Sequence, residues 1–308
     1  MASGGVAFLD PELDRSCGAL LGLAVGDALG APVEGRARDS YPRLADYVAG
    51  GTHDLAAGEW TDDTALAICL AESLLARGGL DERDALERFL RWYRAGENGC
   101  GGRTIGISER TRRTLEDFER SRDTDAAVAT RNDGNGCIMR LAPIAIFHRT
   151  DAATARDAAV RQARLTHTAE PALAATRSLA ELLRVVLVGG GRDTVLELAR
   201  RELGSAFREL PRDAISSAPR ARDTLEAALW CVARADDFEA ILIEAVNLGG
   251  DADTIGAVAG QLAGAIFGAS AIPERWRSRL HSAERIAGLA TRLHRGAERG
   301  GGTGFERS

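Results

Sequence analysis

Two short acidic clusters hold the side chains of this chain that are best suited to chemistry. They occupy residues 60–64 and 249–254, and each places two carboxylates and at least one hydroxyl at the start of an apolar segment. The carboxylates are Asp62 and Asp63 in the first cluster and Asp251 and Asp253 in the second, with the hydroxyls of Thr61, Thr64 and Thr254 beside them. Ligand sets made only of oxygen suit hard divalent cations such as Mg²⁺ or Mn²⁺.

The alternative interpretation of these clusters is structural. Thr and Asp are favoured at helix N-caps, so each cluster alone could simply begin a helix. Four carboxylates gathered without a metal would repel one another and raise some of their pKa values. A shared metal centre is the simplest way to keep all four ionised. The pair of clusters therefore favours a metal site over two separate caps.

Two segments carry glycine at every fourth position, and on a helix each set forms a bare ridge along one face. The sets are Gly18, Gly22, Gly26 and Gly30, and Gly256, Gly260, Gly264 and Gly268. Each mid-helix glycine costs about 0.5–1 kcal/mol relative to alanine, and close helix–helix approach would offset that cost. A compositional bias is the alternative, and the double register speaks against it. We expect two central helices, with Asp27 and Asp253 lining a cavity near the core.

Helical periodicity dominates the rest of the chain. Residues 81–94 place Leu86, Phe89, Leu90 and Tyr93 on one face. Similar patterns cover residues 153–165, 172–188, 193–203, 221–235 and 238–246. No alternating run of β-branched residues is convincing, so the pattern predicts an all-α fold of roughly ten helices.

Composition excludes several classes of protein. The net charge of −6 argues against a general binder of nucleic acid or of anionic membranes. The five cysteines are scattered without a Cys-x-x-Cys pair, which fits a reduced cytosolic protein and argues against a cysteine zinc site. The first residues lack the basic start and apolar stretch of a signal peptide, and the uncharged stretch 254–272 is too weakly hydrophobic for a membrane span. We expect a cytoplasmic protein.

Two further elements are candidates for substrate binding. Gly134-Asn135-Gly136 predicts a tight turn that leads into a helix from Cys137, and exposed backbone N–H groups there would suit a diphosphate. Taken alone, such a turn is more often a plain loop. A lone histidine such as His167 is likewise more often structural than functional.

Together these segments resemble the ADP-ribosylglycohydrolase family, and they look closest to the bacterial dinitrogenase-reductase-activating type. The resemblance runs from Gly18 to about Trp276. It is carried by Gly18–Gly30 with Glu34, Thr61–Thr64, Gly134–Arg140, Thr166-His167 and Asn247–Gly256. It implies a single orthogonal multi-helix bundle over residues 15–295, with an N-terminal extension at 1–14 and a Gly-rich tail at 296–308 that we expect to be disordered.

The resemblance also implies a site. Two Mg²⁺ or Mn²⁺ ions would lie at the base of a cleft, with Thr61, Asp62 and Asp63 on one side and Asp251, Asp253 and Thr254 on the other. Asp62, Asp63, Glu34 and Asp253 would be the catalytic groups, and which of Asp62, Asp63 and Glu34 carries the proton is left open. The implied substrate-binding residues are Glu34, Gly102, Gly134, Asn135, Gly136, Met139 and His167.

The implied function is a metal-dependent hydrolase that cleaves the N- or O-glycosidic bond between ADP-ribose and a modified acceptor. The acceptor would be an ADP-ribosylated protein side chain such as arginine, or a small ADP-ribosyl conjugate, with nucleic acid only as a modified substrate and no membrane partner. In the family the cations orient the ribose and lower the pKa of the attacking water. The alternatives are an ADP-ribose-binding or structural protein without turnover, and a di-metal phosphohydrolase.

One segment departs from the family pattern. Many bacterial members carry an Asp in a stretch that aligns with Cys100–Thr104, and Cys100 takes its place here. That Asp helps to open or position the ribose. Nothing nearby but Arg103 would lower the pKa of the thiol from about 8.5, so we expect Cys100 to be non-catalytic.

Overall fold

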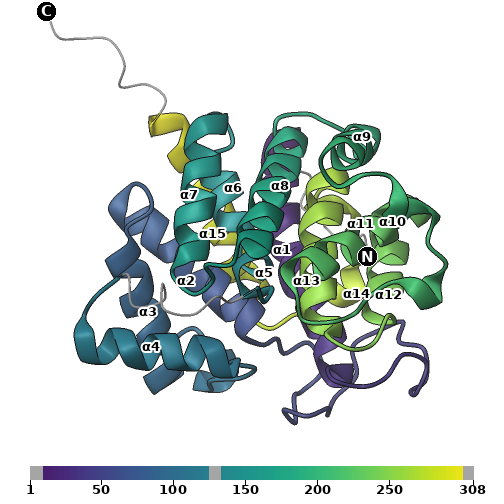
Figure 1. Ribbon diagram of the computed structural model, residues 1–308, viewed down its shortest axis with the longest axis horizontal. Helices are drawn as coiled ribbons and strands as arrows, with labels where there is room; N and C mark the ends of the chain where they lie inside the picture. The colour runs from purple at the N-terminus through teal and green to yellow at the C-terminus, as the bar shows by residue number, and fades with distance from the viewer. Residues whose placement is uncertain (1–9, 125–132, 301–308) are drawn as a thin grey trace, which may run out of the picture.

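The computed structural model describes residues 10–124 and 133–300, and these are almost entirely helices and their connections (Figure 1). The helices are α1 (Pro11–Gly30), α2 (Asp62–Arg77), α3 (Glu82–Ala95), α4 (Glu109–Ser121), α5 (Gly136–Met139), α6 (Ala142–Phe147), α7 (Ala152–Arg164), α8 (Glu170–Leu187), α9 (Arg192–Leu203), α10 (Ala206–Glu209), α11 (Ala221–Arg234), α12 (Phe238–Val246), α13 (Ala252–Phe267), α14 (Glu274–Arg277) and α15 (Ala283–Gly300). Within those two ranges there is no strand, only two isolated bridges. The all-α prediction is confirmed.

The predicted helices are present, and most of their ends are shifted by one or two residues. The pattern at 81–94 corresponds to α3, where the side chain of Asp81 accepts a hydrogen bond from the backbone N–H of Asp84 at 2.9 Å and so caps the helix. Helix α2 is followed by Gly78, which caps it in the left-handed conformation with φ of 71°. Buried apolar side chains from α1 to α15 form one continuous core, as a single bundle requires.

The two glycine ridges lie against each other, because α1 and α13 run antiparallel through the middle of the fold (Figure 1). A Cβ atom on Gly22 would lie 2.2 Å from the carbonyl oxygen of Gly260. The matching distances are 2.0 Å from Gly26 to Gly256 and 2.1 Å from Gly18 to Gly264. No side chain fits in such a gap, so the two backbones are in direct contact. The prediction of two central, glycine-lined helices is confirmed.

The two ends of the ridges behave differently. Gly268 ends α13 with a positive φ of 83° and packs against the side chain of Asp14 instead of a glycine. At the other end, a Cβ atom on Gly30 would lie 2.4 Å from the carbonyl oxygen of Ala252. The C-terminal end of α1 therefore touches the N-terminal end of α13. This contact brings Asp27 and Asp253 together.

The first and last helices reach into the predicted extension and tail. Helix α1 begins at Pro11, inside the predicted extension 1–14, and α15 continues to Gly300, past the predicted start of the tail at Gly296. Residues 1–9 and 301–308 of the predicted extension and tail lie outside the described residues. By length and composition, Pro11–Val33 could cross a membrane, and its most apolar window is completely buried inside the fold.

Replacing Gly260 by alanine should destabilise the protein, because the new methyl group would lie 2.0 Å from the carbonyl oxygen of Gly22. Overpacking of this kind costs about 1–3 kcal/mol. Urea unfolding followed by circular dichroism would measure the change. Gly288→Ala is the matched control, because Gly288 lies in α15 and no atom of the described residues would lie within 4 Å of a Cβ there. That variant should gain about 0.5–1 kcal/mol. Equal free-energy changes in the two variants would contradict the ridge contact.

Candidate metal centre and cleft

The two acidic clusters meet at the N-terminal ends of α2 and α13. Asp62 and Asp63 lie in the first turn of α2, Asp253 lies in the first turn of α13, and Asp251 is the N-cap residue of α13. The positive ends of both helix dipoles therefore face the carboxylates. Among the described residues, two sets have carboxylate oxygens within 4.8 Å of one another and could hold a metal ion: Asp27, Asp63 and Asp253, and Glu34, Asp251 and Asp253.

Burial and mutual repulsion disfavour the ionised form of these carboxyl groups. Burial, reinforced by the neighbouring carboxylates, raises the pKa of Asp62, Asp63 and Asp253 well above the ordinary value. Burial also raises the pKa of Asp27 and Asp251 to about 6, against hydrogen bonds that lower it. The Oδ2 atom of Asp63 is buried and has no hydrogen-bond partner among the described residues. A buried acceptor of this kind is unfavourable unless something binds it.

A divalent cation fits this donor set. Its charge would offset the repulsion among the carboxylates, and it would bind an oxygen such as Asp63 Oδ2 that has no donor. The predicted ligands Thr61, Asp62, Asp63, Asp251, Asp253 and Thr254 all lie at the two helix starts that meet here. Carboxylate and hydroxyl oxygens are the ligands that Mg²⁺ and Mn²⁺ prefer. The structure thus has acidic groups arranged as a metal-binding centre.

Asp27 shapes the start of α2 from a different helix. Its Oδ1 accepts hydrogen bonds from the backbone N–H and the hydroxyl of Thr61, at 3.0 and 2.9 Å. Its Oδ2 accepts from the backbone N–H and the hydroxyl of Thr64, at 3.0 and 2.7 Å. Asp27 therefore takes the place of the usual N-cap side chain. Because the Thr61 hydroxyl donates its hydrogen to Asp27, its lone pairs remain available to a cation.

A cleft of about 850 Å³ opens over the acidic centre, a volume typical of small-molecule sites. Predicted site residues that line it are Glu34, Asp62, Gly134, Asn135, Gly136, Met139, His167, Asp251, Asp253 and Thr254. Thr61 and Asp63 are buried beneath it. Asn135 links the turn to the centre, because its side-chain amide donates a hydrogen bond to Asp251 Oδ2. The structure therefore brings most of the predicted site into one cleft.

His167 packs against the predicted turn. A Cβ atom on Gly136 would lie 2.9 Å from Cε1 of the imidazole, so only glycine allows the ring to sit there. The other side of the ring contacts the hydroxyl of Thr166, with Nδ1 and Oγ1 2.7 Å apart. Burial, with the nearby guanidinium of Arg140, lowers the pKa of His167 well below its ordinary value. A neutral imidazole therefore borders the cleft.

Two expectations about the segment around residue 100 have different outcomes. Gly102 was expected to bind substrate, but it does not line the cleft; it belongs to a short 3-10 turn at Cys100–Gly102. This turn packs on the end of α3, where a Cβ atom on Gly96 would lie 1.8 Å from the Gly102 carbonyl oxygen, and substrate binding by Gly102 stays a prediction. Cys100 is fully buried and accepts a hydrogen bond from the backbone N–H of Trp60. Burial raises the pKa of its thiol to about 12, so the thiol stays neutral.

Another wall of the cleft, formed by the segment before α4 and the first turn of α4, was not revealed by the sequence. Residues 106–111 line the cleft. Gly106 has a φ of 85°, and a Cβ atom there would lie 2.4 Å from Asp62 Oδ1. The loop therefore packs directly on the metal centre, and a glycine is required for that contact.

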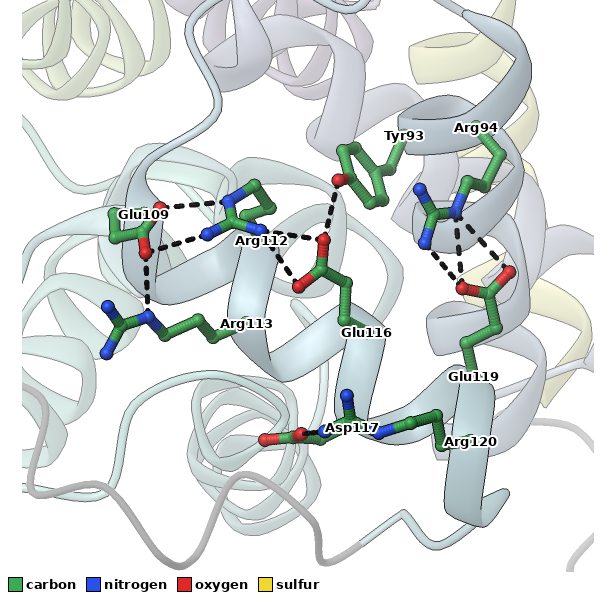
Figure 2. Close-up of polar contacts among 9 residues, drawn as sticks. All are labelled: Tyr93, Arg94, Glu109, Arg112, Arg113, Glu116, Asp117, Glu119 and Arg120. Carbon is green, nitrogen blue, oxygen red and sulfur yellow. Dashed lines mark hydrogen bonds and ion pairs between the residues drawn. The ribbon is translucent and has the colours of Figure 1, made fainter.

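Helix α4 continues from this wall and is tied to α3 by polar side chains (Figure 2). The hydroxyl of Tyr93 donates to Glu116 Oε1 at 2.9 Å, and Arg94 pairs with Glu119 at 2.6 Å. Within α4, Arg112 bridges Glu109 and Glu116. The buried side chains of α4 are few, Leu115 and Phe118 being the apolar ones. The polar contacts therefore help to set where this wall of the cleft lies.

His53 is a second residue that sequence reasoning missed. It lines the cleft, and its Nε2 lies 2.8 Å from Glu34 Oε2. A single histidine in a loop between two helices carries no spacing signal, so no pattern could have singled it out.

Comparison with known proteins identifies the family and supports the fold. The family model for ADP-ribosylglycohydrolase matches residues 9–302. The chain belongs to the ADP-ribosylglycohydrolase family. It is 40% identical over 300 residues to ADP-ribosylarginine hydrolase Tri1 of Pseudomonas putida (strain GB-1), covering 92% of this chain and 80% of that protein. It is 36% identical over 273 residues to the ADP-ribosyl-dinitrogen reductase glycohydrolase of Rhodospirillum rubrum, covering 87% and 90%.

A solved structure agrees with this assignment. A chain described as an ADP-ribosylglycohydrolase-related protein complex superposes with a TM-score of 0.84 at 44% identity, covering 94% of this chain and 100% of that chain. The resemblance noted from the sequence is confirmed. As an ADP-ribosylglycohydrolase, the protein is a hydrolase of glycosyl bonds that removes ADP-ribose from modified acceptors. The comparisons give no support to a binding protein without turnover.

Asp27→Asn should weaken metal binding, although Asp27 lies one helix away from the predicted ligands. The asparagine side chain has one acceptor oxygen where aspartate has two. The N–H and hydroxyl donors of either Thr61 or Thr64 would therefore face an NH₂ group, which cannot accept their hydrogen bonds. Loss of such support around metal ligands typically lowers affinity about 10–100-fold. Isothermal titration with Mn²⁺ would measure this. Asp151→Asn is the control: that carboxylate accepts from the N–H groups of Ala153 and Thr154 at the start of α7. Wild-type Mn²⁺ affinity in Asp27→Asn would refute the role of Asp27.

Added Mn²⁺ should raise the melting temperature of the metal-free protein more at pH 7.5 than at pH 5. The pKa values of Asp27 and Asp251 are about 6 in the folded protein, against about 3.9 in the unfolded chain. The folded state therefore binds more protons, and its stability falls as pH rises through this window. At pH 5 protons relieve the repulsion, whereas at pH 7.5 only a cation can.

Differential scanning fluorimetry of protein stripped with a chelator would measure these shifts. An Asp62→Asn, Asp253→Asn double variant should lose most of the Mn²⁺-dependent shift at pH 7.5. Equal shifts at the two pH values in the wild-type protein would count against cation binding by these carboxylates.

Proposed function

We propose that this ADP-ribosylglycohydrolase cleaves the N-glycosidic bond between ADP-ribose and arginine side chains, with two Mg²⁺ or Mn²⁺ ions in its acidic centre. The observation that carries the proposal is the convergence of two helix starts, rich in carboxylates, beneath a cleft of about 850 Å³. The choice of arginine is supported by the relative from Pseudomonas putida, an ADP-ribosylarginine hydrolase at 40% identity. The proposed acceptor is an ADP-ribosylated protein.

Thr61, Asp62 and Asp63 would hold the cations from the side of α2, and Asp251, Asp253 and Thr254 from the side of α13. When bound, the cations would orient the ribose hydroxyls and lower the pKa of the attacking water. Asp27 and Asn135 would keep the ligands in place through their hydrogen bonds to Thr61 and Asp251.

Glu34 is the best placed of the three candidates for proton transfer. Hydrolysis at an anomeric carbon usually needs a carboxylate as acid or base. Asp63 is 1% exposed and lies below the cleft, and Asp62 is 8% exposed, so both are better suited to binding metal. The side chain of Glu34 is 30% exposed and lines the cleft. It can exchange protons with solvent.

The other end of the cleft would bind the rest of the substrate. The turn at Gly134–Gly136 would offer backbone N–H groups to the diphosphate. Neutral His167 beside it would hydrogen-bond to the substrate without adding charge. Cys100 would take no part, because its buried thiol stays protonated at neutral pH. Other family members have an Asp at this position that helps to open or position the ribose. Here the metal centre and Glu34 would perform that function.

A cytoplasmic location is part of the proposal. All five cysteines are free and buried, which suits a reducing compartment.

A panel of ADP-ribosylated substrates tests the acceptor. With Mn²⁺ present, free ADP-ribose should appear from arginine-linked conjugates at least about tenfold faster than from serine-linked ones, a difference of about 1.4 kcal/mol in barrier. Asp253→Ala should release none at a measurable rate and keep its helical circular dichroism. Faster release from the serine-linked substrate would overturn the arginine assignment. Release of inorganic phosphate in place of ADP-ribose would indicate a phosphohydrolase.

A further inference from the structure

The backbone beside Glu34 is tied to the metal centre. The N–H of Gly35 donates to the carbonyl oxygen of Gly250 at 2.7 Å, and the N–H of Gly250 donates to the carbonyl oxygen of Arg36 at 2.8 Å. Gly250 directly precedes Asp251. The main chain therefore fixes where Glu34 begins, but the direction of its long side chain depends on what the carboxylate contacts.

Two effects favour moving the carboxylate of Glu34 away from the acidic centre. One of its oxygens lies within 4.8 Å of carboxylate oxygens of Asp251 and Asp253, and repulsion from these groups would push it out towards solvent. A free glutamate side chain also gains conformational entropy when it is released. A hydrogen bond from a neighbouring side chain would counteract both effects and hold the carboxylate over the centre.

His53 makes such a contact. Its Nε2 lies 2.8 Å from Glu34 Oε2, and because a carboxylate only accepts hydrogen bonds, Nε2 is the donor. This contact uses Oε2 and leaves Oε1 available to a water or a substrate hydroxyl. An exposed ion pair would contribute little, but here both side chains line the cleft and are only 25% and 30% exposed.

The loop around His53 is itself fixed. Gly50 and Leu55 exchange backbone hydrogen bonds of 2.8 and 3.0 Å, which closes a turn around His53. Gly51, with a φ of 76°, packs so closely that a Cβ atom there would lie 2.6 Å from Cα of Pro32. Pro32 is two residues before Glu34. The turn is therefore docked on the segment that carries Glu34.

We propose that His53 is a positioning residue for hydrolysis: it holds the carboxylate of Glu34 over the acidic centre, with one oxygen bound and the other directed to the reaction. The inference rests on the proposed role of Glu34 in proton transfer. His53 itself takes no proton from the substrate.

Four variants test the proposal on arginine-linked ADP-ribose with Mn²⁺ bound. His53→Ala removes the donor, and His53→Gln keeps an N–H donor at similar reach. Glu34→Gln removes the acid–base group, and the double variant Glu34→Gln, His53→Ala tests whether His53 acts through Glu34. Arg43→Ala is the matched control. Arg43 lies in the same α1–α2 connection as His53, and its ion pair with Glu244 of α12 lies away from the cleft.

We expect Glu34→Gln to lower kcat about 100-fold or more, as loss of an acid–base group does. His53→Ala should lower kcat about tenfold or more, with KM and the Mn²⁺ dissociation constant within about twofold of wild type. His53→Gln should restore most of that loss. In the Glu34→Gln background, His53→Ala should change kcat no further, because effects that act through one group are not additive. Arg43→Ala should leave all of these values unchanged.

The outcomes that overturn the proposal are distinct. A wild-type kcat in Glu34→Gln would contradict the proton-transfer role of Glu34 and, with it, the positioning role of His53. Low kcat in Glu34→Gln with wild-type kcat in His53→Ala would remove the inference alone. A further loss in the double variant would show that His53 acts independently of Glu34. Weaker Mn²⁺ binding in His53→Ala would place its effect on the metal centre. If His53→Ala is unstable, His53→Gln and His53→Leu provide the same comparison of donor and non-donor.

Discussion

The backbone contact between α1 and α13 is the constraint on which the rest of the structure depends. Glycine faces glycine at Gly18, Gly22 and Gly26, so the two helices are closer than any pair with side chains between them could be. The register of that contact fixes the C-terminal end of α1 against the N-terminal end of α13. Asp27, Glu34 and Asp253 derive their mutual positions from it. Without this contact, the helix ends that carry these carboxylates would not be held next to one another.

Burying several carboxylates close together is unfavourable because of desolvation and charge repulsion. Helix dipoles and hydrogen bonds in the fold offset part of this cost. Two helix N-termini point at the centre, and Asp27 receives hydrogen bonds from four donors. These contacts offset only part of the repulsion, because burial still raises the pKa values of Asp62, Asp63 and Asp253. The remainder is what a divalent cation would neutralise. The tendency to bind a divalent cation therefore follows from how the polypeptide positions its own carboxylates.

The sequence predicted the features that are marked by a regular residue spacing or by a characteristic residue type. The i, i+4 glycines predicted the central pair, and the Thr and Asp clusters predicted the centre. Contacts between distant segments left no such mark. Asp27 was expected to line a cavity, but its role as a cap for α2 could not be read from a helix interior. His53 and the segment 106–111 carry no motif. The aligned motif that contains Gly102 does not show how its turn packs.

The buried cysteines have a practical consequence for measuring motion in this molecule. Cys17, Cys69, Cys100, Cys137 and Cys231 are distributed from α1 to α11, and all are inaccessible in the closed fold. A thiol-reactive reagent can therefore label each one only when its surroundings open. Cys100 reports on the turn behind the acidic centre, whereas Cys231 reports on the core beneath α11. The rates of labelling at these five positions would map local opening across the enzyme without a single engineered residue.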